Sequence, residues 1–260
     1  MVRDLSVLTT GLNNPLNYIL KLGVQKITKQ QFIREILNMM HFRRMEFIIA
    51  QFDGIPASGK SYLLDQIQSK LSLKYDIVNW PEPLATWCYS QNGEIDSVFD
   101  AFLKNPVENS YIFQALVFST FLTEEVKIMD ILKSKEHTDK PTLLVRERGI
   151  DSALHVFLPA LQHVNWVELK LLKEFGEAIE KRLMKPHVRI LLDSGIELSM
   201  KRLKSRGRKN EDYSLEYITK LYNNHQDLIK TWDPNTFITM TDNENLEPLI
   251  KKLDSVLKNQ

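Results

Sequence analysis

The stretch "FDGIPASGKSYL", Phe52 to Leu63, decides the fold. Gly54 and Gly59 bracket four residues and Lys60 and Ser61 follow at once, which matches the pattern G-x-x-x-x-G-K-[ST]. In such a loop, backbone N–H groups point at phosphate oxygens and the following helix presents its positive end. The lysine adds a cation, and the serine hydroxyl is suited to Mg²⁺. The residues expected to hold a nucleoside triphosphate are Gly54, Ile55, Pro56, Ala57, Ser58, Gly59, Lys60 and Ser61.

Apolar runs alternate with helical patterns around this loop. Buried strands are expected at Met45–Phe52, Tyr75–Trp80, Pro141–Arg148, His187–Asp193 and Asn235–Thr241. Helices are expected at Gly59–Leu71, Val107–Ser134, Val164–Met184, Ile196–Ser205, Leu215–Thr231 and Leu246–Leu257. This order predicts an α/β fold, a five-stranded parallel sheet with helices on both faces. Because parallel sheets bind ligands beyond the carboxyl ends of their strands, a phosphate site is favoured over a plain strand-to-helix turn.

The composition excludes several classes of protein. Lys and Arg total 34 and Asp and Glu total 33, so a net charge of +1 gives no overall basic footprint for nucleic acid. No apolar run approaches the roughly 18 residues of a membrane-spanning helix. A single cysteine, Cys88, excludes an internal disulfide and indicates a reducing compartment. We expect a cytoplasmic protein without nucleic-acid or membrane partners, with a mitochondrial location as the alternative.

Residues 1–44 are expected to form a basic extension ahead of one domain at residues 45–260. The first 45 residues hold seven Lys and Arg but only two acids, Asp4 and Glu35. This composition fits either an organelle transit peptide or a surface extension that ends in an amphipathic helix at Thr28–Phe42.

A carboxylate follows the second predicted strand, in the run "NWPEPLATWCYSQ" from Asn79 to Gln91. Glu82 lies between two prolines, which keep its backbone stiff and extended. Phosphates repel a carboxylate, so its expected role is to accept a proton from a hydroxyl that attacks the γ-phosphate. Trp87 supplies an aromatic wall suited to a stacked base.

These motifs resemble the deoxynucleoside kinases, a family that includes deoxycytidine, deoxyguanosine and mitochondrial thymidine kinases and the insect multisubstrate enzyme. The resemblance runs from about Phe47 to the C-terminus. It rests on Glu82-Pro83 with Trp87, Phe113-Gln114, Glu147-Arg148 with Phe157, the arginine-rich run "RLKSRGRKNED" and the turn "TDNENL". It implies a P-loop kinase with an arginine-rich lid, which uses ATP and Mg²⁺ to phosphorylate the 5′-hydroxyl of a nucleoside. It also implies a homodimer through the long helices.

The resemblance gives each matching residue an expected role. The catalytic group would comprise Lys60, Glu82, Glu147 and Arg148, with Ser61 and Glu147 at the metal. Three lid arginines and a late turn would complete the ATP site, namely Arg202, Arg206, Arg208, Glu244, Asn245 and Leu246. The nucleoside would contact Glu82, Trp87, Leu103, Gln114, Phe121, Arg148, Ala153, Phe157 and Glu211.

Two carboxylates, Glu82 and Glu147, compete for the role of proton acceptor. A carboxylate bound to Mg²⁺ is the poorer base, because the cation stabilises its charged form. We therefore assign Glu147 to the metal and Glu82 to the hydroxyl.

Some positions depart from the family pattern. Leu103 replaces a tyrosine that helps to hold the 3′-hydroxyl, so the choice of deoxyribose over ribose would rest on Glu211. Gly149 stands where serine is usual. Phe121 and Ala153 stand where members that favour deoxycytidine and purines carry Arg and Asp. Without that charged pair the pocket has room for the 5-methyl group of thymine, which predicts a thymidine-leaning or broad pyrimidine preference.

Other classes of function remain open. A nucleoside monophosphate kinase of the thymidylate kinase type shares the architecture, but it must bind a second phosphate, which a carboxylate such as Glu82 suits less well than a hydroxyl. A non-catalytic kinase-like subunit has no reason to retain Lys60, Ser61, Glu82 and Arg148 together. A P-loop switch or motor ATPase would not account for the aromatic wall that Trp87 is expected to form on the acceptor side.

Overall fold

The computed structural model describes residues 47–91, 94–135, 140–207, 213–241 and 245–259. The expected extension at residues 1–44, with its helix at Thr28–Phe42, lies outside these ranges. None of the described helices combines the length and the apolar character needed to span a bilayer.

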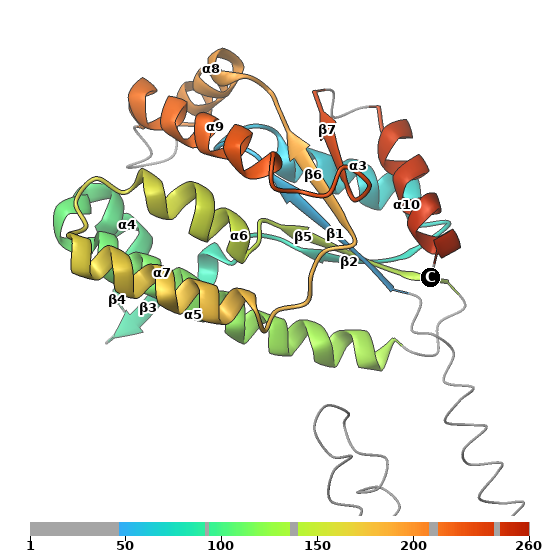
Figure 1. Ribbon diagram of the computed structural model, residues 1–260, viewed down its shortest axis with the longest axis horizontal. Coiled ribbons are helices and arrows are strands. Elements are labelled where there is room, and N and C mark those ends of the chain that lie inside the picture. The colour runs from blue at the N-terminus through green and yellow to red at the C-terminus, as the bar shows by residue number, and fades with distance from the viewer. Residues whose placement is uncertain (1–46, 92–93, 136–139, 208–212, 242–244, 260) are drawn as a thin grey trace, which may run out of the picture. The chain divides into compact units, whose positions relative to one another are not determined.

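A parallel sheet of five strands forms the centre of the fold, in the order β2-β5-β1-β6-β7 (Figure 1). The strands are β1 (Phe47–Asp53), β2 (Asp76–Trp80), β5 (Thr142–Glu147), β6 (Val188–Leu192) and β7 (Phe237–Met240). Every neighbouring pair is parallel, and Phe52 of β1 is in register with Glu147 of β5 and Ile190 of β6. The predicted sheet is confirmed, and β1, which ends at the phosphate loop, is its central strand.

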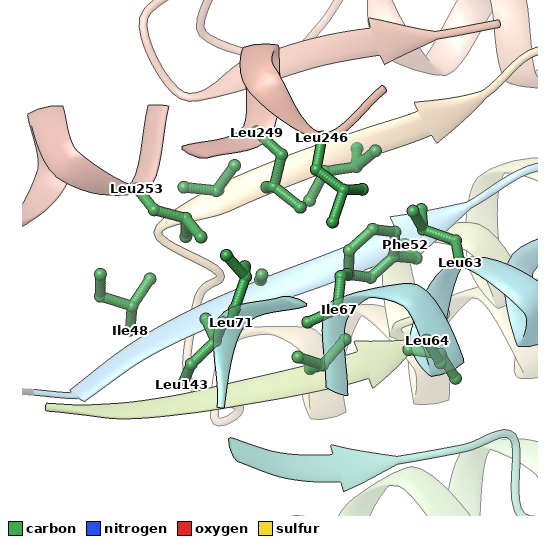
Figure 2. Packing of buried hydrophobic residues seen from close by; sticks show 14 of the residues in the cluster. Ile48, Phe52, Leu63, Leu64, Ile67, Leu71, Leu143, Leu246, Leu249 and Leu253 are labelled. Carbon is green, nitrogen blue, oxygen red and sulfur yellow. The ribbon is translucent and has the colours of Figure 1, made fainter. Parts of the chain in front are cut away.

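Helices cover both faces of the sheet. The long ones are α3 (Lys60–Leu71), α5 (Pro106–Ser134), α7 (Trp166–Glu180), α8 (Ile196–Arg206), α9 (Leu215–Ile229) and α10 (Glu247–Asn259). Successive side chains of β1 point to opposite faces. Ile48, Ala50 and Phe52 pack with α3 and α10, whereas Ile49 packs with Ile128 of α5 on the other face. Figure 2 shows the packing of β1 with α3 and α10.

The predicted helix at Val164–Met184 is shorter in the structure, where α7 spans Trp166–Glu180. Its start is set by Asn165, whose side chain accepts hydrogen bonds from the backbone N–H groups of Val167 and Glu168, while Glu168 Oε2 accepts from Asn165 N. This capping box stabilises the first turn of α7. After Glu180 the helix gives way to turns before β6.

Several short elements were not anticipated. They are η1 (Leu84–Trp87), the antiparallel hairpin β3 (Cys88–Gln91) and β4 (Glu94–Ser97), α4 (Val98–Lys104), α6 (Ile150–Ser152), η2 (Ala153–Phe157) and η3 (Leu158–Ala160). The hairpin had a signal in the sequence, since the dipeptide Asn-Gly at positions 92–93 is typical of two-residue hairpin turns. The others are too short for periodicity to reveal them.

Candidate active site

The phosphate loop connects the end of β1 to the start of α3, the strand–loop–helix context that the motif requires. Gly54 and Gly59 adopt φ values of 147° and 103°, which favour glycine. A Cβ atom on Gly54 would lie 2.6 Å from the carbonyl oxygen of Leu192. The loop therefore presses against the end of β6, and a side chain at this position has no room.

Lys60 is buried beneath the loop. Its Nζ donates hydrogen bonds to the carbonyl oxygens of Gly54, at 3.1 Å, and Ile55, at 3.2 Å, and lies 3.9 Å from Glu147 Oε1. Burial lowers the pKa of Lys60 to about 8, and the nearby Arg148 cation adds to this, while the Glu147 carboxylate opposes it. The ammonium is held at the centre of the loop, the position from which the P-loop lysine contacts phosphates.

Glu82 and Arg148 form an ion pair across the carboxyl ends of two neighbouring strands. Arg148 Nη1 donates to Glu82 Oε2 at 2.5 Å, and Arg148 Nη2 lies 3.4 Å from Gly54 O. Arg148 has a left-handed φ of 62°, and its backbone N–H bonds to Phe52 O at 2.8 Å. Burial favours the neutral form of this guanidinium, but the carboxylates of Glu82 and Glu147 outweigh that and raise the Arg148 pKa.

One cavity of about 560 Å³ brings most of the predicted site residues together. The predicted residues among its walls are Pro56, Ala57, Gly59, Lys60, Ser61, Glu82, Trp87, Gln114, Phe121, Glu147, Arg148, Ala153, Phe157, Arg202 and Arg206. The phosphate loop and the aromatic residues thus share one space. Arg148, which pairs with Glu82, contacts both Gly54 O of the loop and the Phe157 ring, so a group held by the aromatic residues would lie near Glu82 and the loop.

Aromatic residues build the end of the cavity away from the loop. Trp87 packs edge-on against Phe113, with ring centroids 5.2 Å apart, and its Nε1 donates to Thr120 Oγ1 at 3.2 Å. Gln114 is buried, and its Nε2 donates to Ala153 O at 3.1 Å. The Arg148 guanidinium lies 5.0 Å from the centre of the Phe157 ring. This end suits a flat, mostly apolar ring that offers a few hydrogen-bonding groups.

The predicted metal residues fit a magnesium–nucleotide complex. Ser61 and Glu147 line the same cavity. Within the described ranges, no group of three or more His, Cys, Asp or Glu side chains is placed to hold a metal ion. Mg²⁺ is commonly held by one or two protein oxygens together with substrate phosphates and water, so a hydroxyl and one carboxylate suffice.

Six predicted residues are not among the cavity walls, namely Gly54, Ile55, Ser58, Leu103, Asn245 and Leu246. The first three belong to the loop itself. Leu246 is 3% exposed and packs in the core with Phe52 and Leu63 (Figure 2), while Asn245 Oδ1 accepts from Glu247 N at the start of α10. Arg208, Glu211 and Glu244 lie outside the described residues. The roles of all the predicted site residues, those among the walls included, stay predictions.

The structure adds wall residues that the sequence reasoning missed. They are Tyr62, Pro81, Leu84, Phe99, Phe102, Phe113, Val117, Gly149, Leu161, Tyr213 and Tyr217. Phe99 and Phe102 are three residues apart on α4, and Tyr213 and Tyr217 are four apart with stacked rings. On α4 that spacing, which puts two residues on one helix face, was the available signal, whereas Tyr213 precedes α9 and had no such signal. Burial raises the pKa of Tyr217 to about 12, so its phenol stays protonated at neutral pH.

A buried polar network underlies the site. Gln51 Nε2 donates to Asp53 Oδ2 at 2.9 Å and to Asp151 Oδ1 at 2.7 Å, and Gln51 Oε1 accepts from Arg146 Nη2 at 2.9 Å. Asp53 also accepts from Ser152 Oγ. Burial, together with the Asp151 charge, raises the pKa of Asp53 to about 6. These bonds fix the Gln51 amide between β1, β5 and α6.

The Gln51 amide explains why position 149 is glycine, and this leads to a stability prediction. A Cβ on Gly149 would lie 2.2 Å from Gln51 Oε1 and 2.7 Å from Asp151 Oδ1. Since three hydrogen bonds hold the amide, Gly149→Ala is expected to lower the free energy of unfolding by about 1–3 kcal/mol. Urea unfolding of Gly149→Ala, Gln51→Ala and the double variant measures this. The cost of the alanine at 149 should shrink once Gln51 is truncated, and strictly additive costs would contradict the steric explanation.

The comparisons with known proteins agree with this geometry. A family model for the deoxynucleoside kinases matches residues 51–259. No curated protein matches the chain closely enough to count as a relative. The family match covers well over half of the sequence, from Gln51 near the end of β1 to Asn259 at the end of α10. The chain therefore belongs to the deoxynucleoside kinase family.

Proposed function

We propose that this protein transfers the γ-phosphoryl group of ATP to the 5′-hydroxyl of a deoxynucleoside, with a broad or pyrimidine-leaning preference. The observation that carries the proposal is the Glu82–Arg148 pair, which lines the same cavity as Lys60 and Gln114. A carboxylate that shares one cavity with a phosphate loop and aromatic residues is suited to deprotonate a sugar hydroxyl. The products are the nucleoside 5′-monophosphate and ADP.

In the proposed mechanism, Glu82 accepts the proton of the 5′-hydroxyl while the hydroxyl oxygen attacks the γ-phosphorus. Lys60 binds the terminal phosphates, and Arg148 orients Glu82 next to them. Ser61 and Glu147 would hold Mg²⁺, which when bound neutralises charge on the phosphates. Arg202, on α8, donates to Ser58 O at 3.0 Å and stabilises charge that develops on the transferred group.

Base recognition would rest on hydrogen bonds and stacking. The Gln114 amide offers a donor and an acceptor to a base edge, and Phe157 offers a flat face. Phe121 and Ala153, which line the cavity, bring no charge to the base. This favours a pyrimidine with room for a 5-methyl group.

A panel of phosphoryl acceptors tests the proposal. Thymidine, deoxycytidine, deoxyadenosine, deoxyguanosine and thymidine monophosphate are each supplied with ATP and Mg²⁺, and ADP release is followed. We expect pyrimidine deoxynucleosides to give the highest kcat/KM. Turnover of the monophosphate alone would indicate a thymidylate kinase activity, and no turnover with any acceptor would indicate a non-catalytic subunit. A strong purine preference would reject the pyrimidine assignment.

The pKa of Lys60 predicts how the activity depends on pH. In the free enzyme this pKa is lowered to about 8, so the ammonium loses its proton as the pH rises through that value. Because kcat/KM reports the free enzyme, kcat/KM for ATP should fall about tenfold per pH unit above that point. Lys60→Arg keeps its charge, so its residual kcat/KM should show no such fall. A wild-type profile that stays flat to about pH 9.5 would contradict the prediction.

We also propose that the protein forms a homodimer. Helices α5 and α7 pack against each other and both expose large apolar side chains. These are Val107, Tyr111, Ile112, Leu122, Val126 and Met129 on α5, and Trp166, Val167, Leu169, Leu171 and Phe175 on α7. Exposed apolar surface of this kind marks interaction sites. A solution mass of twice 30.4 kDa by light scattering supports the dimer, and a monomeric mass rejects it.

A further inference from the structure

A π-helical turn carries part of the aromatic end of the cavity. Residues Ala153–Phe157 form this turn, η2, in which the N–H of Leu158 bonds to the carbonyl oxygen of Ala153. Both Ala153 and Phe157 line the cavity. π-helical turns are rare and frequently occur at functional sites. An extra residue in a turn re-aims the side chains beyond it, so the direction of Phe157 depends on how this turn is held.

Two side chains from distant helices hold the turn through its carbonyl oxygens. Gln114 of α5 donates to Ala153 O at 3.1 Å, and Asn224 of α9 donates through Nδ2 to Val156 O at 2.8 Å. The next residue on α9, His225, packs edge-on against Phe157, with ring centroids 6.4 Å apart and an interplanar angle of 85°. Helix α9 therefore contacts both the backbone of the turn and the ring that it presents.

The same face of α9 also contributes to the cavity wall. Tyr217 lines the cavity and precedes Asn224 by seven residues, which is two helical turns. One helix face thus carries a wall residue at one end and the anchor of the π-helical turn at the other. A displacement of α9 would move both Tyr217 and Phe157.

We propose that Asn224 is a positioning residue for the nucleoside: its hydrogen bond to Val156 O fixes the π-helical turn so that Phe157 presents its ring to the base. This inference rests on the proposed function. The hydrogen bond of Asn224 ends on Val156 O, in the turn that carries Phe157, so its effect is expected at the nucleoside end of the cavity. The Arg148 guanidinium, 5.0 Å from the Phe157 ring centre, is a further contact of this ring.

His225 is suited to this arrangement because it is neutral. Burial lowers its pKa to about 3, and the Arg148 and Lys60 cations act in the same direction. The histidine is 1% exposed, and its Nδ1 lies 2.8 Å from Leu221 O, so Nδ1 carries the proton and donates it. A neutral ring packs against Phe157 without bringing a second positive charge toward Arg148.

A matched pair of variants on α9 tests the proposal. Asn224→Ala removes the hydrogen bond, while Asn223→Ala makes the same substitution at the exposed neighbouring position. For Asn224→Ala we expect the KM for thymidine to rise about tenfold, the effect of losing one hydrogen bond, with the KM for ATP within about twofold of wild type. Amide hydrogen exchange of a peptide covering residues 150–160 should be faster. Asn223→Ala should change none of these quantities.

The outcomes separate this proposal from the function on which it rests. If wild type phosphorylates no deoxynucleoside, the proposed function fails. In that case, amide exchange at residues 150–160 that is the same in Asn224→Ala as in wild type also rejects Asn224 as the residue that holds the turn. If wild type is active, equal changes in both KM values, or a thymidine KM that matches the Asn223→Ala value, overturn the proposal. Should Asn224→Ala not fold, Asn224→Leu fills the space without a donor and is judged by the same criteria.

Discussion

Glu82→Gln is expected to lower kcat by about 10²–10⁴-fold while ATP binding stays unchanged. Glutamine has the size of glutamate and still accepts a hydrogen bond from Arg148 Nη1, which contacts Glu82 Oε2 in the structure. It cannot accept a proton, so the attacking hydroxyl loses its base. The loss should appear in kcat and not in the affinity for ATP, since the phosphate loop and Lys60 are untouched.

Steady-state kinetics with thymidine and an ATP-dependent thermal shift measure the two effects separately. Glu108→Gln is the control, because Glu108 is an exposed glutamate in the first turn of α5. A kcat for Glu82→Gln close to that of the control would overturn the assignment of the base. In that case Glu147, which lies 3.9 Å from Lys60, is the remaining candidate, and Glu147→Gln should then carry the larger loss.

Arg202→Met is expected to lower kcat by about 10³-fold or more, since an arginine that stabilises a transferring phosphoryl group contributes 10³–10⁵ in rate. Arg202 lies on α8, lines the cavity and donates to Ser58 O of the phosphate loop at 3.0 Å. Methionine keeps much of the length of the side chain but removes its charge and its donors. Because the charge develops in the transition state, the KM for the nucleoside should change little.

Lys201→Met provides the comparison for Arg202→Met. Lys201 is the exposed neighbour of Arg202 on α8, so its replacement removes one positive charge from the same helix without touching the loop. Both variants are measured with saturating ATP and thymidine, and their thermal stabilities are compared. Equal, small changes in kcat would show that α8 supplies only a diffuse positive field. A fall in the stability of Arg202→Met without a fall in kcat would assign the Ser58 contact to folding.

The sequence alone determined the central sheet and the phosphate loop, because both depend on local chemistry. A strand buried on both faces must be apolar along its length, and every predicted strand lies within two residues of a strand in the structure at each end. The glycines of the loop are required by backbone geometry, since Gly54 and Gly59 adopt positive φ values. Such requirements act within a few residues and are therefore visible in a motif.

Other features of the site depend on contacts between segments that are distant in the sequence. The contact between Glu82 and Arg148 joins residues 66 positions apart, and the bond between Gln51 and Asp151 joins residues 100 apart. Both exist because β5 lies between β2 and β1 in the sheet, an order that no local pattern encodes. The same holds for Gly149, whose missing side chain leaves space for the Gln51 amide.

Tertiary packing placed Leu246 away from the cavity, where the sequence predicted it, and placed Asn224 near the cavity, where the sequence did not predict it. Leu246 belongs to the late turn that the resemblance places at the ATP site, but its side chain packs in the core with residues of β1. Asn224 has no motif, and only the approach of α9 to the π-helical turn gives it a contact near the cavity. Apolar periodicity and loop chemistry determined the long helices, the strands of the central sheet and the phosphate loop, but not the short elements around the cavity. Which segments lie together was decided by burial of the shared core, because hydrophobic burial is non-directional and carries no local signature.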